Sequence, residues 1–343
     1  DELIVVDTGS TDRTVEIAES FGAKVIHHEW TGDFAAARNV GWDAASCDWK
    51  LFLDADEVLV EGEGPRLRAL LGHTWREAIS LVETNFTGDT DSGLSVDHNA
   101  MRLFRNRPEY RFKDRIHEQI AYALPGIPER FEVSTVRIEH YGYLGVVREQ
   151  KDKATRNLDL LRQQLADGHD TPFVRFNLGS EYLALDDHEQ ALEHYGRAWD
   201  ALAQDRDRLS YPYFPSLANR YVRTLRHCGR HEQTLAIGDE VLELLPGFSD
   251  VAFEQASSCL EQQHYEEAER RFHEVLELGD APTRYAGSRG TGSFLTRRQL
   301  GVLYAEQERY GDSAEEFRAA LRANPGFLAA TQPLVQSELL LGV

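Results

Sequence analysis

Short apolar runs alternate with segments of helical periodicity at the start of the chain, and this alternation constrains the fold more than any other feature. Residues 3–6, 24–28 and 49–53 have the composition of buried strands, and a helix that Asp33 caps is expected before the third of them. Strands joined by crossover helices form a parallel sheet, and such a sheet binds ligands at its carboxyl edge. The first part of the chain is therefore predicted to be a Rossmann-like α/β domain.

Carboxylates follow two of these strands at the point where each strand ends. Asp7 comes directly after residues 3–6, and Asp54 and Asp56 come directly after residues 51–53. Asp54 and Asp56 would share one side of a continuing strand, and a turn at Ala55 could spread them to hold a metal and a ligand together. Carboxylate oxygens suit Mg²⁺ or Mn²⁺. A solvated turn is the alternative for an isolated Asp-x-Asp tripeptide, but the shared sheet edge favours a cation site.

The formal charge of −21 limits the partners of the protein. Nucleic acid and anionic membrane surfaces would be repelled, and phosphate chemistry would need a bound cation and a few local Arg or His side chains. The 343 residues suffice for two domains. No apolar run has the length of a membrane span, and the three cysteines are widely spaced without a CxxC pair. A soluble, cytoplasmic protein with reduced cysteines is expected.

The chain is expected to divide into a first domain at residues 1–145, a connecting helix at residues 146–170 and a helical domain at residues 171–343. Residues 77–143 contain irregular β segments, which would add antiparallel strands to the sheet. The connecting segment is amphipathic, with leucines at helical spacing that predict a packing role.

The helical domain shows the residue spacing of tetratricopeptide repeats, whose period is about 34 residues. Two weaker copies lie between two good ones, and residues 203–215 and 281–293 would be insertions. Such repeats stack into a superhelix with a concave groove. The first good copy contains Leu178, Gly179, Tyr182, Ala191, Tyr195 and Ala198, and the last contains Leu300, Gly301, Tyr304, Ser313, Phe317, Ala320 and Pro325.

Several motifs in the first 143 residues together resemble a known enzyme family. They are residues 4–14 (IVVDTGSTDRT), 33–39 (DFAAARN), 53–57 (LDADE), 115–118 (RIHE) and 140–143 (HYGY). With them the chain resembles family 2 glycosyltransferases of the GT-A fold, in the subgroup with tetratricopeptide repeats behind the catalytic domain. That subgroup includes enzymes of lipopolysaccharide core assembly and, more distantly, S-glycosyltransferases that modify glycocin-type peptides.

The resemblance implies a donor site built from four of these residues. Asp7 would contact the nucleotide base, Arg38 would add a nucleotide contact, Asp54 would reach the ribose and metal region, and Asp56 would coordinate the cation that bridges the donor diphosphate. Glu57 would be a structural acid beside them. The alternative for Asp7 is a cap for the turn that follows it, and the alternative for Arg38 is an ion pair on a helix surface.

The resemblance also implies a late metal ligand and an acceptor base. His140 would be the metal ligand, with an ordinary core or surface histidine as the alternative. An inverting transfer needs a base within hydrogen-bond reach of the acceptor nucleophile, and Glu118 is the first candidate. His117 could donate to the diphosphate or serve as the base itself, and a salt bridge between Arg115 and Glu118 is the structural alternative.

The sequence departs from the family at its start, because the family's catalytic domain has another strand and helix before the position of Asp1. Such a unit takes roughly thirty residues. Either the working protein carries a preceding segment, or the chain is a fragment with an exposed sheet edge at residues 3–6, which would invite aggregation. The first explanation is favoured.

The resulting hypothesis is a metal-dependent, inverting glycosyltransferase that uses Mn²⁺ or Mg²⁺ and a nucleotide sugar, most simply a UDP sugar. The repeat domain would hold a peptide or protein acceptor or pair two subunits as a homodimer. Three alternatives stay open: an acceptor that is a glycan or lipid-linked saccharide, an inactive transferase fold that serves as a repeat-based scaffold, and a sugar nucleotidyltransferase. The acidic segment Gly9–Asp12 argues against the last, which would need a basic phosphate loop.

Overall fold

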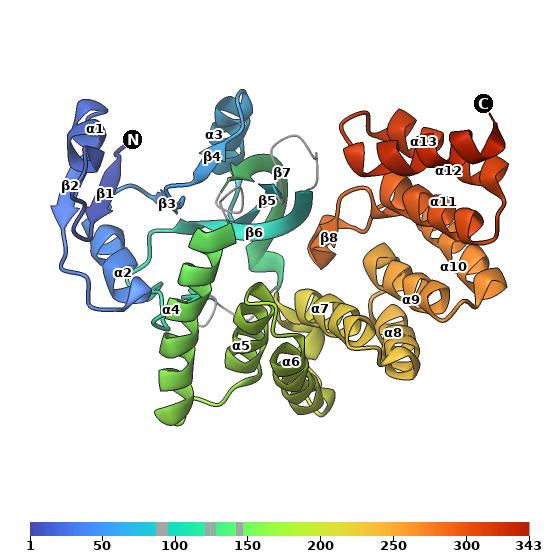
Figure 1. The fold of residues 1–343 in the computed structure, drawn as a ribbon. Coiled ribbons are helices and arrows are strands. Elements are labelled where there is room, and N and C mark those ends of the chain that lie inside the picture. Colours follow the sequence, from blue (N-terminus) through green and yellow to red (C-terminus); the bar gives the residue numbers. More distant parts are fainter. Residues whose placement is uncertain (87–94, 121–123, 125–127, 142–146, 343) are drawn as a thin grey trace. The chain divides into compact units, whose positions relative to one another are not determined.

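The fold was analysed in a computed structural model that describes residues 1–86, 95–120, 124, 128–141 and 147–342 (Figure 1). The chain forms two compact units. The first, called the sheet unit, comprises Asp1–Val82, Ala100–Ile138 and Thr155–His169. The second, called the repeat unit, comprises Glu83–Asn99, Glu139–Ala154 and Asp170–Val343.

The sheet unit begins with a parallel pair of strands. β1 (Ile4–Asp7) pairs with β2 (Lys24–His27), and α1 (Thr14–Ser20) connects them. The register sets Ile4 opposite Lys24 and Asp7 opposite His27. The first two predicted strands and their parallel orientation are therefore confirmed.

Helix α2 (Phe34–Ala44) begins where the sequence predicted, because the Asp33 side chain accepts a hydrogen bond from the backbone N–H of Ala36 at 2.8 Å. Its Trp42 is buried and makes edge-on contacts with the rings of Phe104 and Phe112 at centroid distances of 5.7 and 5.1 Å. This aromatic cluster anchors α2 against the sheet.

The larger sheet has the strand order β3-β6-β5-β7-β4, in which β3 and β6 are antiparallel. Its strands β5, β6 and β7 confirm the β segments expected between residues 77 and 143, and their outer ends belong to the repeat unit. The elements are β3 (Trp49–Leu51), β4 (Glu57–Leu59), α3 (Glu63–His73), β5 (Ala78–Phe86), β6 (Ser95–Arg105) and β7 (Phe131–His140).

The prediction of one parallel sheet through residues 3–6, 24–28 and 49–53 is wrong. Among the described residues β1 pairs only with β2, and β3 pairs only with β6. A cavity of about 720 Å³ is lined by residues of both β1 and β3. Paired strands lie only about 4.8 Å apart, which leaves no room for such a cavity between them. Its walls are mostly apolar and include Val5, Val6 and Leu51. Asp7 and Asp54 therefore do not end neighbouring strands.

Helix α4 (Val147–Ala166) follows the sheet, and the predicted boundary at residues 145 and 146 lies outside the described residues. Leu158 and Leu161 of this helix are buried. None of the helices in the described ranges is long and apolar enough to cross a bilayer.

The repeat unit consists of helix pairs, as the repeat spacing predicted. In both good copies the glycine of the first helix faces an aromatic ring of the second: a Cβ on Gly179 would lie 2.6 Å from the Tyr195 ring, and one on Gly301 would lie 2.8 Å from the Phe317 ring. The helices are α5 (Pro172–Ala184), α6 (His188–Ala203), α7 (Phe214–His227), α8 (His231–Leu244), α9 (Ser249–Glu261), α10 (Tyr265–Leu278), α11 (Thr296–Glu306), α12 (Tyr310–Ala323) and α13 (Thr331–Leu341).

The second predicted insertion contains the short strand β8 (Gly287–Ser288), which pairs with the part of β6 that belongs to the repeat unit. Asp250 of α9 is buried and accepts a hydrogen bond from the Ser288 backbone N–H at 2.7 Å. Asp280 accepts from the backbone N–H groups of Gly290 and Gly292. These carboxylates hold the insertion against the helices.

Candidate active site

A tight turn presents the Asp-x-Asp motif of the sheet unit. The Asp54 backbone N–H donates to Glu57 Oε2 at 2.9 Å, and the Glu57 N–H donates to the Asp54 carbonyl at 3.0 Å. Glu57 is buried and forms an ion pair with Arg102 through its other oxygen. Asp56 is half-buried in this turn. The predicted structural role of Glu57 agrees with these contacts, which fix the backbone of the turn.

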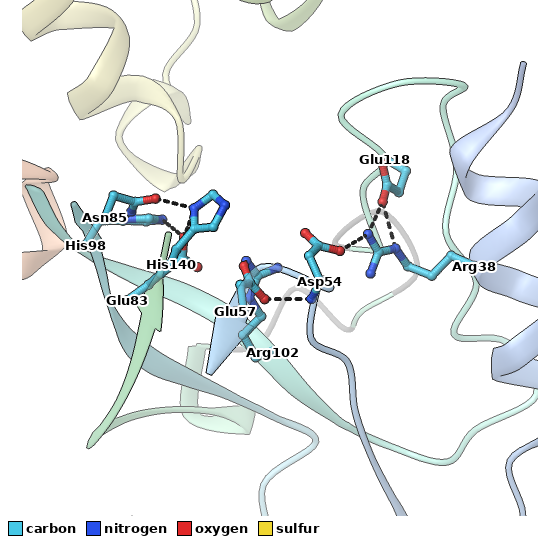
Figure 2. Close-up of polar contacts among 9 residues, drawn as sticks. All are labelled: Arg38, Asp54, Glu57, Glu83, Asn85, His98, Arg102, Glu118 and His140. Atoms are coloured by element: carbon cyan, nitrogen blue, oxygen red, sulfur yellow. Dashed lines mark hydrogen bonds and ion pairs between the residues drawn. The ribbon is translucent and has the colours of Figure 1, made fainter. Parts of the chain in front are cut away.

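Arg38 lies between two carboxylates that are far apart in the sequence (Figure 2). Its Nη2 contacts Asp54 Oδ1 at 2.9 Å and Glu118 Oε1 at 2.5 Å, and its Nε donates to the same Glu118 oxygen at 2.7 Å. These three residues are called the Arg38 cluster below. Burial lowers the pKa of Arg38, but the charges of Glu118 and Asp54 outweigh this effect and raise it. The guanidinium therefore stays charged.

Glu118 belongs to a short loop, residues 113–119, that is called the Glu118 loop. Two backbone hydrogen bonds between Lys113 and Gln119, at 3.0 and 2.9 Å, close it. The Arg115 carbonyl accepts from the Phe34 N–H at 2.8 Å, which ties the loop to the first residue of α2. His117 adopts a left-handed backbone conformation with φ of 53°, which is uncommon for a residue with a side chain.

Within the described residues, the structure brings Glu118 together with Arg38 and not with Arg115, so the salt bridge between Arg115 and Glu118, the structural alternative, is not formed. Glu118 Oε1 receives both hydrogen bonds from Arg38, and Oε2 makes no hydrogen bond to a residue of the described ranges. The side chain is 12% exposed. One carboxylate oxygen is thus held, and the other is available to a ligand.

Asn39 is a residue of this site that the sequence reasoning missed. Its side-chain N–H donates to the Phe112 carbonyl at 2.9 Å, and its side-chain oxygen accepts from the Phe112 N–H at 3.0 Å. The amide thereby pairs with the backbone just before the Glu118 loop, as a neighbouring strand would. The only signal in the sequence was its position beside Arg38 in the motif of residues 33–39.

Asp7 lies outside the Arg38 cluster. Its Oδ1 accepts from the Ser10 backbone N–H at 3.0 Å, and its Oδ2 lies 3.2 Å from His27 Nδ1. Hydrogen bonds from the Ser10 side chain and backbone, and then from His27, lower the pKa of Asp7 to about 2. The turn-capping alternative therefore describes its contacts, and nucleotide binding by Asp7 stays a prediction.

His140 belongs to the repeat unit, where it lies within a polar group on the outer ends of the strands (Figure 2). Its Nδ1 lies 2.6 Å from Asn85 Oδ1 and 3.7 Å from a carboxylate oxygen of the buried Glu83. The Asn85 amide in turn lies 3.1 Å from His98. A role of His140 as a metal ligand stays a prediction, and Gly142 and Tyr143 of its motif lie outside the described residues.

The chemistry of the turn at residues 54–57 fits a divalent cation. Asp54 and Asp56 offer hard carboxylate oxygens on a backbone that Glu57 fixes, and the Asp54 side chain is 44% exposed. Mg²⁺ and Mn²⁺ are commonly bound by one or two carboxylates together with water and substrate phosphates. The Arg38 cluster carries two carboxylates against one guanidinium, so its excess negative charge also favours a cation.

Comparison with known proteins identifies the domain that carries this site. The sequence model described as "Glycosyl transferase family 2" matches residues 1–136, which include the Asp54 turn and the Glu118 loop. Residues 1–136 therefore match a family 2 glycosyltransferase domain. A tetratricopeptide repeat model matches residues 174–199, which correspond to most of α5 and most of α6. Both parts of the predicted architecture are therefore confirmed.

Two curated relatives align with part of this chain. A TPR repeat-containing protein of Synechococcus elongatus is 38% identical over 185 residues, which are 52% of this chain and 45% of the relative. The glycosyltransferase SunS of Bacillus subtilis, derived from the SPbeta prophage, is 27% identical over 195 residues, which are 56% of this chain and 46% of the relative. The aligned part of the chain thus spans about half the length of these relatives.

Two of the solved structures to which the chain is similar are described as TPR proteins. One is TTC0263, a thermophilic TPR protein of Thermus thermophilus, with 16% identity and a TM-score of 0.40. The match covers 57% of this chain and all of that protein.

Proposed function

We propose that the protein is a metal-dependent, inverting glycosyltransferase that moves a sugar from a nucleotide donor, most simply a UDP sugar, to a peptide or protein acceptor. The observation that carries this proposal is the Arg38 cluster: a carboxylate with one oxygen held and one available lies beside the Asp-x-Asp turn of a family 2 glycosyltransferase domain. Asp54 and Asp56 would bind the donor side, and Glu118 would face the acceptor.

In the proposed reaction, the acceptor nucleophile forms a bond to the anomeric carbon as the bond from that carbon to the diphosphate oxygen breaks. The electron pair of the broken bond leaves with the nucleoside diphosphate, and the proton of the nucleophile passes to Glu118 Oε2. A cation held by Asp56 would neutralise charge on the diphosphate. His117 is the alternative base, and His140 is a further candidate ligand for the cation.

The stack of helix pairs supports a peptide or protein acceptor, because repeat proteins commonly bind extended peptides in their grooves. A glycan or lipid-linked saccharide is the competing acceptor class. Mass spectrometry after incubation with UDP sugars and candidate peptides distinguishes these classes. Only an enzyme with a peptide or protein acceptor produces a peptide whose mass rises by one sugar residue.

The donor chemistry is tested by the release of UDP from UDP-glucose, UDP-N-acetylglucosamine and UDP-galactose. We expect release that requires Mn²⁺ or Mg²⁺ and that falls at least about 100-fold in Asp56→Asn, because a metal supplies several kcal/mol of charge stabilisation to the transition state. Asp48→Asn is the matched control, since Asp48 is an exposed aspartate of the same unit. Its rate should stay within about twofold of the wild type.

Calorimetric titration with Mn²⁺ and with UDP supplies a readout that does not depend on turnover. Asp56→Asn should weaken the binding of Mn²⁺, and Asp48→Asn should not. Full activity in the presence of EDTA would contradict the metal dependence. A wild-type protein that binds neither UDP nor Mn²⁺ would contradict the transferase proposal and favour a repeat-based scaffold.

A further inference from the structure

A single nitrogen atom joins the two sides of the proposed active site. Arg38 Nη2 contacts Glu118 Oε1 at 2.5 Å and Asp54 Oδ1 at 2.9 Å. The two carboxylates come from positions 64 residues apart, one from the turn after β3 and the other from the Glu118 loop. Neither carboxylate oxygen can therefore shift without changing its distance to the same guanidinium.

The guanidinium of Arg38 is itself held in place by aromatic rings. It lies over the Phe52 ring at 4.5 Å and near the Phe112 ring at 5.3 Å, and the side chain is only 20% exposed. A planar guanidinium stacks on rings and presents nitrogens in a fixed fork, whereas the ammonium of a lysine is a single, mobile point charge. A residue fixed in this way is suited to orienting its neighbours.

The charge balance explains why an arginine is needed here. Two carboxylates that share one nitrogen lie close enough to repel each other, and partial burial strengthens this repulsion. The guanidinium offsets it. Both of its hydrogen bonds to Glu118 go to Oε1, so Arg38 also decides which oxygen of Glu118 is occupied and which one points away from it.

We propose that Arg38 is a positioning residue that acts through Glu118, setting its carboxylate beside the Asp54 turn so that Oε2 meets the acceptor nucleophile. This inference rests on the proposed function for its catalytic meaning. It replaces the role of nucleotide ligand that the family resemblance implied for Arg38. The guanidinium already contacts two carboxylates, and it would affect the reaction only through them.

The test is a double-mutant cycle on the hydrolysis of UDP-glucose with Mn²⁺, in which water takes the place of the acceptor. We expect Arg38→Gln to lower kcat at least about 30-fold while the Kd of UDP changes by less than about threefold. Arg38→Lys should recover little of this loss. In a Glu118→Gln background, Arg38→Gln should cause no further loss, because residues that act as a unit have non-additive effects.

Arg107→Lys is the matched control. Arg107 also pairs with a buried glutamate of the same unit, since its Nε and Nη2 lie 3.1 and 3.0 Å from the Glu77 carboxylate. Within the described residues, its side chain pairs with Glu77 and not with the Arg38 cluster. This variant should keep the wild-type kcat within about twofold, whereas Arg38→Lys should not. Equal losses in the two variants would mean that the effect is a general loss of structure, and would overturn the proposal.

Two further outcomes separate this inference from the proposed function. If Arg38→Gln weakens UDP binding in step with activity and slows Glu118→Gln further, Arg38 is a donor ligand and the inference fails. If the wild type hydrolyses no nucleotide sugar, the donor chemistry fails instead. The same cycle on urea unfolding then decides whether Arg38 holds Glu118: we expect a coupling of at least about tenfold in the unfolding constant. Independent effects would overturn the inference.

Discussion

Arg38 and Asn39 are adjacent on α2 but control different parts of one segment. Asn39 pairs with the backbone of Phe112, and Arg38 holds the side chain of Glu118 six residues later. The Lys113–Gln119 hydrogen bonds close the loop between these two points. One turn of helix therefore sets both the path of the Glu118 loop and the orientation of its carboxylate.

We predict that Asn39→Ala lowers the free energy of unfolding by about 1–3 kcal/mol, because the N–H and carbonyl of the buried Phe112 lose their partners. Asn39→Asp should also lose stability, since an aspartate can still accept from the Phe112 N–H but sets its second carboxylate oxygen against the Phe112 carbonyl oxygen. Urea unfolding of the three proteins measures both effects. Equal stability of the alanine variant and the wild type would contradict this role of Asn39.

The helix pairs of the repeat unit depend on glycines at the point of closest approach. Gly179 on α5 faces the fully buried ring of Tyr195 on α6, and Gly301 on α11 faces the ring of Phe317 on α12. Glycine costs helix stability in isolation, so its presence at both positions is explained by packing. The same contact between a glycine and an aromatic ring occurs in the α5–α6 pair and in the α11–α12 pair, so both pairs pack in the same way.

We predict that Gly179→Ala destabilises the protein by about 1–3 kcal/mol, because the added methyl would lie 2.6 Å from atoms of the Tyr195 ring. Gly311→Ala in α12 is the matched control. A Cβ there would meet no atom within 4 Å, so helix propensity alone acts. It should be neutral or stabilising by up to about 1 kcal/mol. Thermal unfolding compares the two; a stabilising effect of Gly179→Ala would refute the packing argument.

A buried carboxylate costs stability unless a cation or hydrogen-bond donors compensate for the loss of water. Asp250 is the clearest case in the repeat unit. Burial raises its pKa to about 6, although hydrogen bonds from Ser288 act in the opposite direction. Its Oδ2 has no partner among the described residues. The ionised form is thus disfavoured in the folded protein.

This shift predicts a pH dependence of stability. The folded pKa lies above the usual aspartate value of 3.8, so the contribution of Asp250 is fully present below about pH 4 and is lost as the pH rises through about 6. Asp250→Asn removes this dependence. The stability of the variant minus that of the wild type should rise between pH 4 and pH 8 by up to about 3 kcal/mol.

Urea unfolding at pH 4.5, 6 and 8 measures this change. Glu243→Gln is the control, since Glu243 is exposed on α8 and should follow the wild-type curve. A constant difference between Asp250→Asn and the wild type across this range would show that Asp250 is not held in a charge-disfavouring environment.

Much of the fold could be predicted because its signals are local. The cap at Asp33, the helix of residues 34–44 and the small and aromatic residues of the repeats lie within a few turns of the residues that they contact. The Asp54–Glu57 turn is local too, and its acids indicated a site. The parallel sheet was predicted incorrectly because the alternation of strands and helices does not reveal which strands are neighbours, and β1 and β3 lie in different sheets.

The sequence by itself determined the α/β beginning, the helical repeats, the family of the first domain and most of the residues proposed for the site. Only the tertiary structure decided how those residues act together. Arg38 lies 80 residues from Glu118 and 16 from Asp54 along the chain, and no periodicity connects such positions. Their contact depends on how α2, the Asp54 turn and the Glu118 loop pack. Distances between side chains of different elements follow from this packing and not from the spacing of the residues along the sequence.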